Sequence, residues 1–257
     1  MTVHTISDLT STQIRERLET APVLLVPVGA TEQHGPNLGC GVDWRIADEL
    51  AKRIADRVDP LALVAPAFPL GLSAHHLDFP GTLHLRPETF MAVFTDLVTS
   101  YARHGVEKVV FINGHRGNEN ILGVLTTKLT FELGIQTASA FWMRQAADVI
   151  ARHRKTDRWG HACEIETSLA LALVPEIVDT EHLEAGDLIE DYLPYEDNYQ
   201  QHALQVPRTF ASRTRNGVFG DARVASRHAG EDIAEATVSR TAEFVRAFAQ
   251  RPGVSRN

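Results

Sequence analysis

Four short apolar runs, each followed by a helical pattern, constrain the fold of this chain more than any other feature. The runs are almost continuously apolar, whereas the apolar residues between them recur about every 3.6 positions. The expected strands are 22–29, 61–71, 106–114 and 135–142, and the expected helices are 43–58, 86–105, 118–134, 161–175 and 232–250. This alternation predicts an α/β fold in which helices cover both faces of a parallel sheet.

The 257 residues contain no internal repeat and no Pro/Ser-rich linker, so we expect a single domain over 1–257. The segment 181–197 carries seven acidic residues and no lysine or arginine. We interpret it as a solvated loop or short surface helix, with a role in subunit contacts as the alternative.

Composition narrows the classes of partner. The formal net charge of −8 disfavours nucleic-acid binding through a general basic surface and gives no support for binding to an acidic membrane. No apolar run approaches the roughly 20 residues of a membrane helix, and the N-terminus lacks a secretory pattern. Two cysteines without a C-x-x-C pair indicate no disulfide scaffold. We expect a cytoplasmic protein with no nucleic-acid or membrane partner.

Polar or aromatic side chains follow every expected strand. In strand order they are Glu32 and His34; Ser73, His75 and His76; Asn113, His115 and Asn118; and Trp142. Ligands of open parallel sheets bind outside the carboxyl ends of the strands, so these residues predict a site at one sheet edge. Whether His75 and His76 line a pocket or cap their loop stays open at this point.

The loop after the first strand carries donors for a metal ion. Glu32, Asp43 and His34 offer oxygen and nitrogen ligands that suit Zn²⁺ or Mn²⁺. Asp43 begins the helix 43–58, whose dipole keeps the carboxylate ionised. Taken singly, Asp43 could be a helix cap and Glu32 a solvated turn residue. Together with His115 they favour a metal site.

The segment "HACEIETS" adds His161, Glu164 and Glu166. If a regular helix began at 161, Glu164 would share a face with His161 while Glu166 would point elsewhere. A helix that begins later would relax this constraint, so spacing leaves the choice between the two glutamates open. Cys40 and Cys163 lie in these motif segments, but small packed residues are favoured over a cysteine nucleophile. No G-x-S-x-G elbow, P-loop or G-x-G-x-x-G follows a strand.

Four strings in chain order, "PVGATEQHGPNLGCGVD", "GLSAHHLDFPGT", "VVFINGHRGN" and "HACEIETS", resemble the creatininase (creatinine amidohydrolase) family. They run from residue 27 to 168, and "GVFGDARVAS" (217–226) is a weaker fifth match. The resemblance implies a three-layer α/β/α sandwich around a mostly parallel sheet, commonly assembled as a homo-hexamer. It also implies two divalent metal ions per chain, Zn or Mn.

The resemblance assigns the metal ligands residue by residue. The E-x-H pair corresponds to Glu32 and His34, the bridging aspartate to Asp43, and the N-G-H histidine to His115. Creatininase itself supplies a glutamate two residues after that histidine, where this chain has Gly117. Relatives with glycine there use the glutamate of the H-A-x-x-x-E-T-S motif, which selects Glu166 here.

The residue after His115 bears on the substrate. Creatininase has a tyrosine there, whereas this chain has Arg116, which suits a carboxylate or phosphate group. Creatinine is therefore not the substrate that we expect. Trp142 and Trp159 could wall the pocket for a flat substrate or pack in the core. The candidate substrate-binding residues are Arg116, Ser73, His75, Trp142 and Trp159.

The expected function is metal-dependent hydrolysis of a C–N amide bond in a small cyclic, formyl or short peptide-like amide. A hydroxide bridging the two ions would attack the amide carbon. The candidate catalytic residues are His161, as proton shuttle or oxyanion donor, and Glu166. The alternatives are a creatininase-like peptidase, a formamidopyrimidine deformylase or, because Gly117 lacks the carboxylate, a non-catalytic ligand-binding relative.

Overall fold

The sheet lies between two layers of helices in the computed structural model, which describes residues 4–191, 193 and 204–252. The strands are β1 (Val23–Val28), β2 (Ala62–Val64), β3 (Lys108–Asn113) and β4 (Gln136–Phe141), all parallel and in the order β2-β1-β3-β4. Val23 pairs with both Ala62 and Lys108, so the carboxyl ends of the strands meet at one edge. The predicted α/β/α sandwich with a mostly parallel sheet is confirmed.

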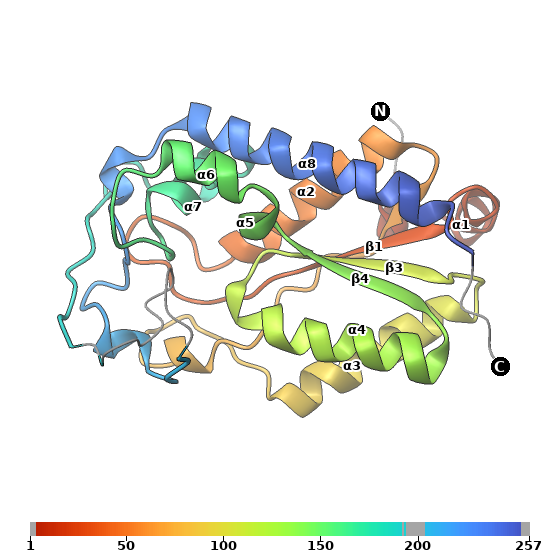
Figure 1. The fold of residues 1–257 in the computed structure, drawn as a ribbon, viewed down its shortest axis with the longest axis horizontal. Helices are drawn as coiled ribbons and strands as arrows, with labels where there is room; N and C mark the ends of the chain where they lie inside the picture. The colour runs from red at the N-terminus through yellow and green to blue at the C-terminus, as the bar shows by residue number, and fades with distance from the viewer. Residues whose placement is uncertain (1–3, 192, 194–203, 253–257) are drawn as a thin grey trace.

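Helices cover both faces of the sheet (Figure 1). On one face lie α2 (Val42–Val58), α5 (Trp142–Gln145), α6 (Ala147–His153), α7 (Glu164–Leu173) and α8 (Arg227–Ala249). On the other lie α3 (Pro87–Ala102) and α4 (Glu119–Leu133), while α1 (Ser11–Leu18) precedes β1. In the described part of the chain, no helix combines the length and the apolar character that crossing a membrane requires.

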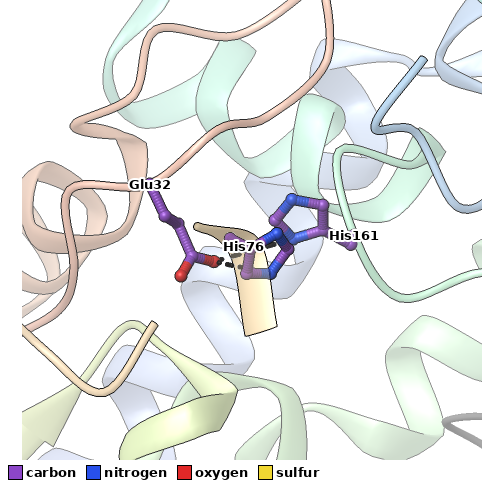
Figure 2. Close-up of side chains that lie close together, drawn as sticks. All are labelled: Glu32, His76 and His161. Atoms are coloured by element: carbon purple, nitrogen blue, oxygen red, sulfur yellow. Dashed lines mark ion pairs between the residues drawn. The ribbon is translucent and has the colours of Figure 1, made fainter. Parts of the chain in front are cut away.

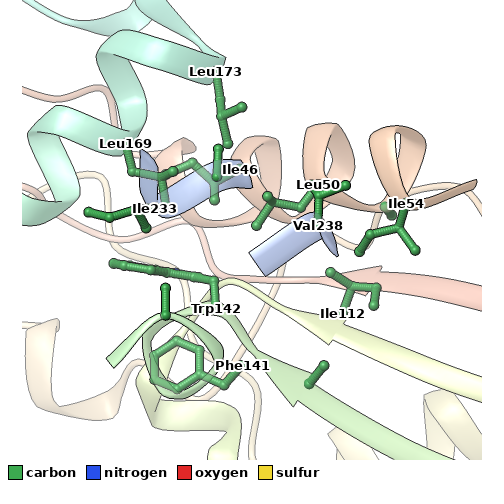
Figure 3. Packing of buried hydrophobic residues seen from close by; sticks show 14 of the residues in the cluster. Ile46, Leu50, Ile54, Ile112, Phe141, Trp142, Leu169, Leu173, Ile233 and Val238 are labelled. Carbon is green, nitrogen blue, oxygen red and sulfur yellow. The ribbon is translucent and has the colours of Figure 1, made fainter. Parts of the chain in front are cut away.

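Alternation along β1 divides the core in two. Val23 and Leu25 face the helices α2 and α8, while Leu24 and Val26 face α3 and α4. The first core is filled from α2, α7 and α8, as Figure 3 shows for Ile46, Leu169 and Ile233 among others. Each fully buried side chain of this size contributes about 1.5–3 kcal/mol to folding. The strand ends are therefore held rigidly at the edge where the polar residues follow.

Several boundaries differ from those expected. β2 ends at Val64 instead of continuing to residue 71, because Pro66 and Pro69 cannot donate to the sheet. α7 begins at Glu164 and not at 161, and α8 begins five residues earlier than predicted, after the capping side chain of Ser226. The helices α1, α5 and α6 were not expected from the pattern. Within the acidic segment, 181–191 form a loop with isolated bridges, while residues 192 and 194–197 lie outside the described residues.

Glycines bring the first turn of α2 against the strand ends. A Cβ on Gly114 would lie 2.0 Å from the carbonyl oxygen of Asp43, and one on Gly29 would lie 2.3 Å from the amide nitrogen of Trp44. No other residue fits at such a distance, so both positions require glycine. This close approach carries the Asp43 carboxylate to the sheet edge.

Candidate metal centre

Five predicted ligands converge at the carboxyl edge of the sheet. Glu32 and His34 follow β1, Asp43 lies in the first turn of α2, His115 follows β3, and Glu166 lies in the first turn of α7. Each is at most 5% exposed. They line or border a narrow cavity of about 20 Å³. We call this cavity the metal pocket; its lining includes Glu32, Asp43, His75, His76, His115, Arg116, His161 and Glu166.

The Asp43 carboxylate lies between two donor sets. Its Oδ2 is 3.1 Å from His115 Nδ1, which in turn is 3.3 Å from Glu32 Oε1. The other oxygen, Oδ1, is 3.2 Å from His34 Nε2, and that nitrogen is 3.5 Å from Glu166 Oε2. One aspartate is thus shared by a Glu32–His115 set and a His34–Glu166 set, which is the arrangement expected of a bridging ligand.

The spacing and chemistry of these atoms fit divalent ions. Two ligands about 2.0–2.1 Å from a tetrahedral zinc ion lie about 3.3 Å from one another. Glu32 Oε2, His34 Nε2 and Asp43 Oδ2 are buried and have no hydrogen-bond partner among the described residues. Buried polar atoms without a partner are expensive unless a ligand satisfies them. The donor cluster therefore fits the ions that the sequence predicts.

Backbone carbonyls fix which nitrogen of each histidine faces the pocket. His34 Nδ1 donates to the carbonyl oxygen of Glu32 at 3.1 Å, and His115 Nε2 donates to that of Leu72 at 3.2 Å. Because a carbonyl only accepts, the nitrogen beside it carries a proton, and the other nitrogen of each ring faces the carboxylates and is the one available to a metal ion. Such outer contacts orient histidine ligands in metal sites.

The buried carboxylates favour positive charge on the groups around them. Burial works against the charged form of His34, but Asp43 and Glu166 outweigh it and raise its pKa well above the usual value. His115 behaves alike: burial is outweighed by Glu32 and Asp43, so its pKa is raised. Burial works against ionisation of Asp43, yet His34 and His115 hold its pKa below the usual range. Three buried carboxylates meet here, and bound cations would balance their charge.

Glu164 and Glu166 have different tasks. Glu166 Oε2 accepts the amide of Ala162 at 2.7 Å and faces His34. Ala162 has a positive φ of 50°, so the chain turns sharply and helix α7 begins only at Glu164. Glu164 points away, where its oxygens accept the Thr156 amide at 3.0 Å and the Asp221 amide at 3.2 Å. Of the two glutamates that spacing left open, Glu166 is the one whose carboxylate lies at the metal pocket.

His161, His76 and Gln33 form a second cluster around Glu32. The rings of His76 and His161 lie beside the Glu32 carboxylate, at 3.4 and 3.8 Å from its Oε1 (Figure 2). His161 Nε2 donates to the Gln33 carbonyl at 2.7 Å, which leaves Nδ1 bare. The Gln33 side chain donates to His76 Nδ1 at 2.9 Å, so His76 presents an N–H to Glu32. Burial, reinforced by nearby histidines, lowers the pKa of both rings, so both are neutral near pH 7.

Sequence reasoning missed Gln33 altogether and did not include His76 among the site residues. Gln33 stands inside the E-x-H string, where its two neighbours drew attention as ligands. Its amide is fixed because Oε1 accepts the Gly35 amide at 2.9 Å. The sequence did offer one signal, because Gln33 is a polar residue between two candidate ligands, Glu32 and His34.

The predicted substrate-binding residues divide into two groups. Arg116 and His75 line the metal pocket, and Trp159 lines the cavity beside it. Burial lowers the pKa of His75 to about 4, against the opposing field of Glu32. Ser73 and Trp142 line neither cavity. Trp142 was expected at the pocket but is 1% exposed in the core, where its indole N–H donates to the Gly114 carbonyl at 3.3 Å, and Phe141 lines the pocket instead.

The cysteines do not supply a nucleophile at this site. Cys163 is fully buried, and burial together with the Glu164 charge raises the pKa of its thiol far above the usual value. A thiol held in the protonated form is a poor nucleophile, since the thiolate is the reactive species. Neither Cys163 nor the partly buried Cys40 lines the metal pocket.

Curated relatives are hydrolases of varied substrates. The chain is 31% identical to a creatinine amidohydrolase of Pseudomonas putida, over 87% of this chain and 88% of that protein. It is 30% identical to a mycofactocin precursor peptide peptidase of Mycolicibacterium smegmatis, over 93% of this chain and 91% of that protein. It is 27% identical to a 3-dehydro-scyllo-inosose hydrolase of Thermotoga maritima, over 95% of this chain and 83% of that protein. The three substrates differ, so similarity indicates a hydrolase without fixing what it cleaves.

Solved creatininase structures share the fold throughout. A crystal structure of creatinine amidohydrolase superposes with a TM-score of 0.85 at 27% identity, covering 98% of this chain and all of that one. A mutant creatininase of zinc–zinc type gives a TM-score of 0.83 at 27% identity, over 98% and 100%. A manganese creatininase gives 0.82 at 26% identity, over 97% and 100%. With the donor cluster found here, these forms confirm the expectation of divalent zinc or manganese cofactors.

The family model described as creatininase, creatinine amidohydrolase, matches residues 7–245. That range holds every residue of the metal pocket and all the strands and helices except the last turn of α8 and a short 3₁₀ turn before α1. The expectation of a creatininase-type hydrolase is confirmed, and the chain belongs to the creatininase family.

Proposed function

We propose that the chain hydrolyses a C–N amide bond in a small amide substrate, cyclic, formyl or short peptide-like, with two divalent ions held by the metal pocket. The observation that carries this proposal is the Asp43 carboxylate shared by two donor sets, each completed by one histidine and one glutamate. Glu32, Asp43 and His115 would hold one ion, and His34, Asp43 and Glu166 the other. When bound, such a pair supplies a hydroxide nucleophile near neutral pH and a Lewis acid for the carbonyl oxygen.

His161 is the residue placed to move the proton. Its Nε2–H is committed to the Gln33 carbonyl, so the bare Nδ1 is the atom that can accept. The lowered pKa keeps the ring neutral before reaction. Nδ1 accepts the proton released as water adds to the amide carbon and returns it to the leaving nitrogen as the C–N bond breaks. Gln33 acts only through His161 and His76, whose rings it orients.

The pocket also bears on the non-catalytic alternative, which was motivated by the missing carboxylate at Gly117. A Cβ at that position would lie 2.3 Å from His115 Nε2 and 2.5 Å from the Leu72 carbonyl oxygen, so a glutamate could enter only if His115 moved. Glu166 brings a carboxylate to the same donor cluster from α7. The donor set is complete without the residue that is absent, which favours an enzyme.

Metal analysis and an amide panel test the proposal. We expect metal-replete protein to hold about two ions and to hydrolyse at least one compound among lactams, formamides and short peptides. Glu166→Gln removes a ligand of the His34 set, so it should lower the content toward one ion per chain and abolish most activity. Less than one ion per wild-type chain, or full occupancy and activity in Glu166→Gln, would refute the assignment.

Glu164→Gln is the matched control, two residues away on the same helix. Its carboxylate holds the amides of Thr156 and Asp221, so the change should lower the melting temperature by removing buried hydrogen bonds worth about 1–3 kcal/mol. The folded variant should keep its metal. Opposite readouts for the two glutamates separate a metal ligand from a structural carboxylate.

Other expectations stay predictions. They are a single domain over 1–257, a homo-oligomer that is commonly a hexamer in the family, a cytoplasmic location, and no nucleic-acid or membrane partner. A peptidase or a formamidopyrimidine deformylase remains the alternative among C–N hydrolases. The panel decides between them, because formamides and peptides are separate members of it.

A further inference from the structure

A second cavity of about 320 Å³ adjoins the metal pocket. The two share Arg116, Phe141 and Met143 in their walls, so a ligand in the second cavity would lie next to the metal pocket. Its volume is in the range of small-molecule sites. We call it the arginine cavity; its lining is Arg116, Glu119, Phe141, Met143, Arg144, Ala147, Ile150, Ala151, Arg154 and Trp159.

The lining is cationic in a chain that is acidic as a whole. Among the described residues, the lining carries three arginines and one glutamate, a formal charge of +2, against −8 for the whole chain. Glu119 is occupied by Arg144, with Oε1 2.8 Å from Arg144 Nε. The two other arginines of the lining are Arg116, which is half-buried, and Arg154, which is exposed. Among the described residues, the Arg154 guanidinium has no hydrogen-bond or ion-pair partner.

The rest of the wall is apolar and comes from one helix and three neighbouring side chains. Ala147, Ile150 and Ala151 belong to α6, while Phe141, Met143 and Trp159 border it. Trp159 is partly buried against the core, which fixes the ring. A ligand that fits this surface has an apolar body and a negatively charged end.

We propose that the arginine cavity binds an oxyanion carried by the substrate, a carboxylate or a phosphate, with Arg154 and Arg116 as its partners. This inference rests on the proposed function for the bond that is cleaved, and it narrows the substrate to an amide with an anionic group on an apolar body. A guanidinium holds either oxyanion through two parallel N–H donors, which a neutral ligand cannot match. The metal pocket then receives the amide while the arginine cavity receives the anion.

Ligand binding tests this inference without requiring turnover. Calorimetry on the metal-loaded protein would compare N-acetylphenylalanine, phenyl phosphate and the neutral N-acetylphenylalaninamide. We expect at least one anionic probe to bind about 10-fold more tightly than the neutral one, since a charge-assisted pair is worth about one factor of ten or more. The tighter of the two anionic probes identifies the source as carboxylate or phosphate.

Arg154→Gln should remove most of that preference, whereas Arg152→Gln should keep it. Arg152 lies on α6, just before the C-cap residue Arg154; it is 64% exposed and pairs with Asp148 outside the cavity, so it controls for net charge. Equal affinities for neutral and anionic probes would overturn the inference. So would a preference that persists in Arg154→Gln, because the preference for anions would then not depend on Arg154. If binding behaves as expected while no amide of the panel is cleaved, the proposed function fails and the anion site stands.

Discussion

The metal pocket and the arginine cavity share a wall but are built in opposite ways. The first gathers five candidate ligands, carboxylates and imidazoles that are each at most 5% exposed, around a volume of about 20 Å³. The second gathers guanidinium groups, some of them exposed, around a volume of about 320 Å³. Rigid strand ends and helix starts hold the first, whereas the short helices α5 and α6 carry much of the second. If both proposals hold, the core fixes the groups that carry out the reaction, whereas substrate selection depends on a surface where substitutions cost little stability.

The largest effect that this comparison predicts is that of Asp43→Asn. Both donor sets lose a charged ligand at once, so we expect metal content below one ion per chain. The rate constant kcat should fall on the order of 1000-fold, equivalent to about 4 kcal/mol of transition-state stabilisation. Elemental analysis and steady-state kinetics on any amide that the panel identifies would measure both.

Asp48→Asn is the control for this change. Asp48 lies on the same helix and does not line the metal pocket. Its Oδ2 is 2.6 Å from Lys52 Nζ. Its replacement should leave metal content and kcat unchanged, because a pair of this kind contributes at most about 1 kcal/mol to stability. Retention of two ions and full activity in Asp43→Asn would remove the shared ligand from the mechanism.

A smaller effect is expected from Gly117→Ala, which adds one methyl group beside the metal pocket. The new Cβ would lie 2.3 Å from His115 Nε2, so the imidazole must shift and lose its bond to the Leu72 carbonyl. Disturbing the orientation of a histidine ligand typically lowers metal affinity about 10- to 100-fold. Competition with a chelator of known affinity measures the loss.

Gly123→Ala tests whether this loss is local. A Cβ at Gly123 meets nothing within 4 Å on the exposed side of α4. Alanine in a helix is more favourable than glycine by about 0.5–1 kcal/mol, so this variant should melt slightly higher and bind metal as the wild type does. An unchanged metal affinity in Gly117→Ala would mean that His115 relaxes without leaving its place.

The sequence predicted the buried parts of this architecture well and the direction of individual side chains poorly. Continuous apolar runs identified β1, β3 and β4, since buried parallel strands tolerate little else. The length of β2 was wrong because two prolines interrupt it. Helices α5 and α6 are four and seven residues long, too short for periodicity to reveal.

The convergence of Glu32, His34 and His115 could be predicted because they follow β1 and β3, and the parallel topology brings the ends of these neighbouring strands together. The choice between Glu164 and Glu166 could not come from periodicity alone, because it depends on the positive φ at Ala162, which sets where α7 begins. Periodicity also could not show on which side of the strand end the Trp142 side chain lies. Adjacent residues at the end of β4 point to different sides, and only the packing decides that Phe141 lines the pocket while Trp142 enters the core.

Arg116→Ala is the smallest of these changes and the one that most sharpens the comparison, because Arg116 lines both cavities. If it serves the arginine cavity, losing it should raise KM for anionic amides about 10-fold and leave neutral amides within about twofold, with kcat nearly constant for both. If it serves the metal pocket, kcat should fall for both classes alike, because the transition state would lose a contact that does not depend on the substrate charge. Equal rises of KM for anionic and neutral amides would mean that Arg116 only shapes the cavity wall and does not recognise charge. The ratio of kcat/KM between a matched anionic and neutral amide therefore shows whether Arg116 acts in substrate selection or in the reaction itself.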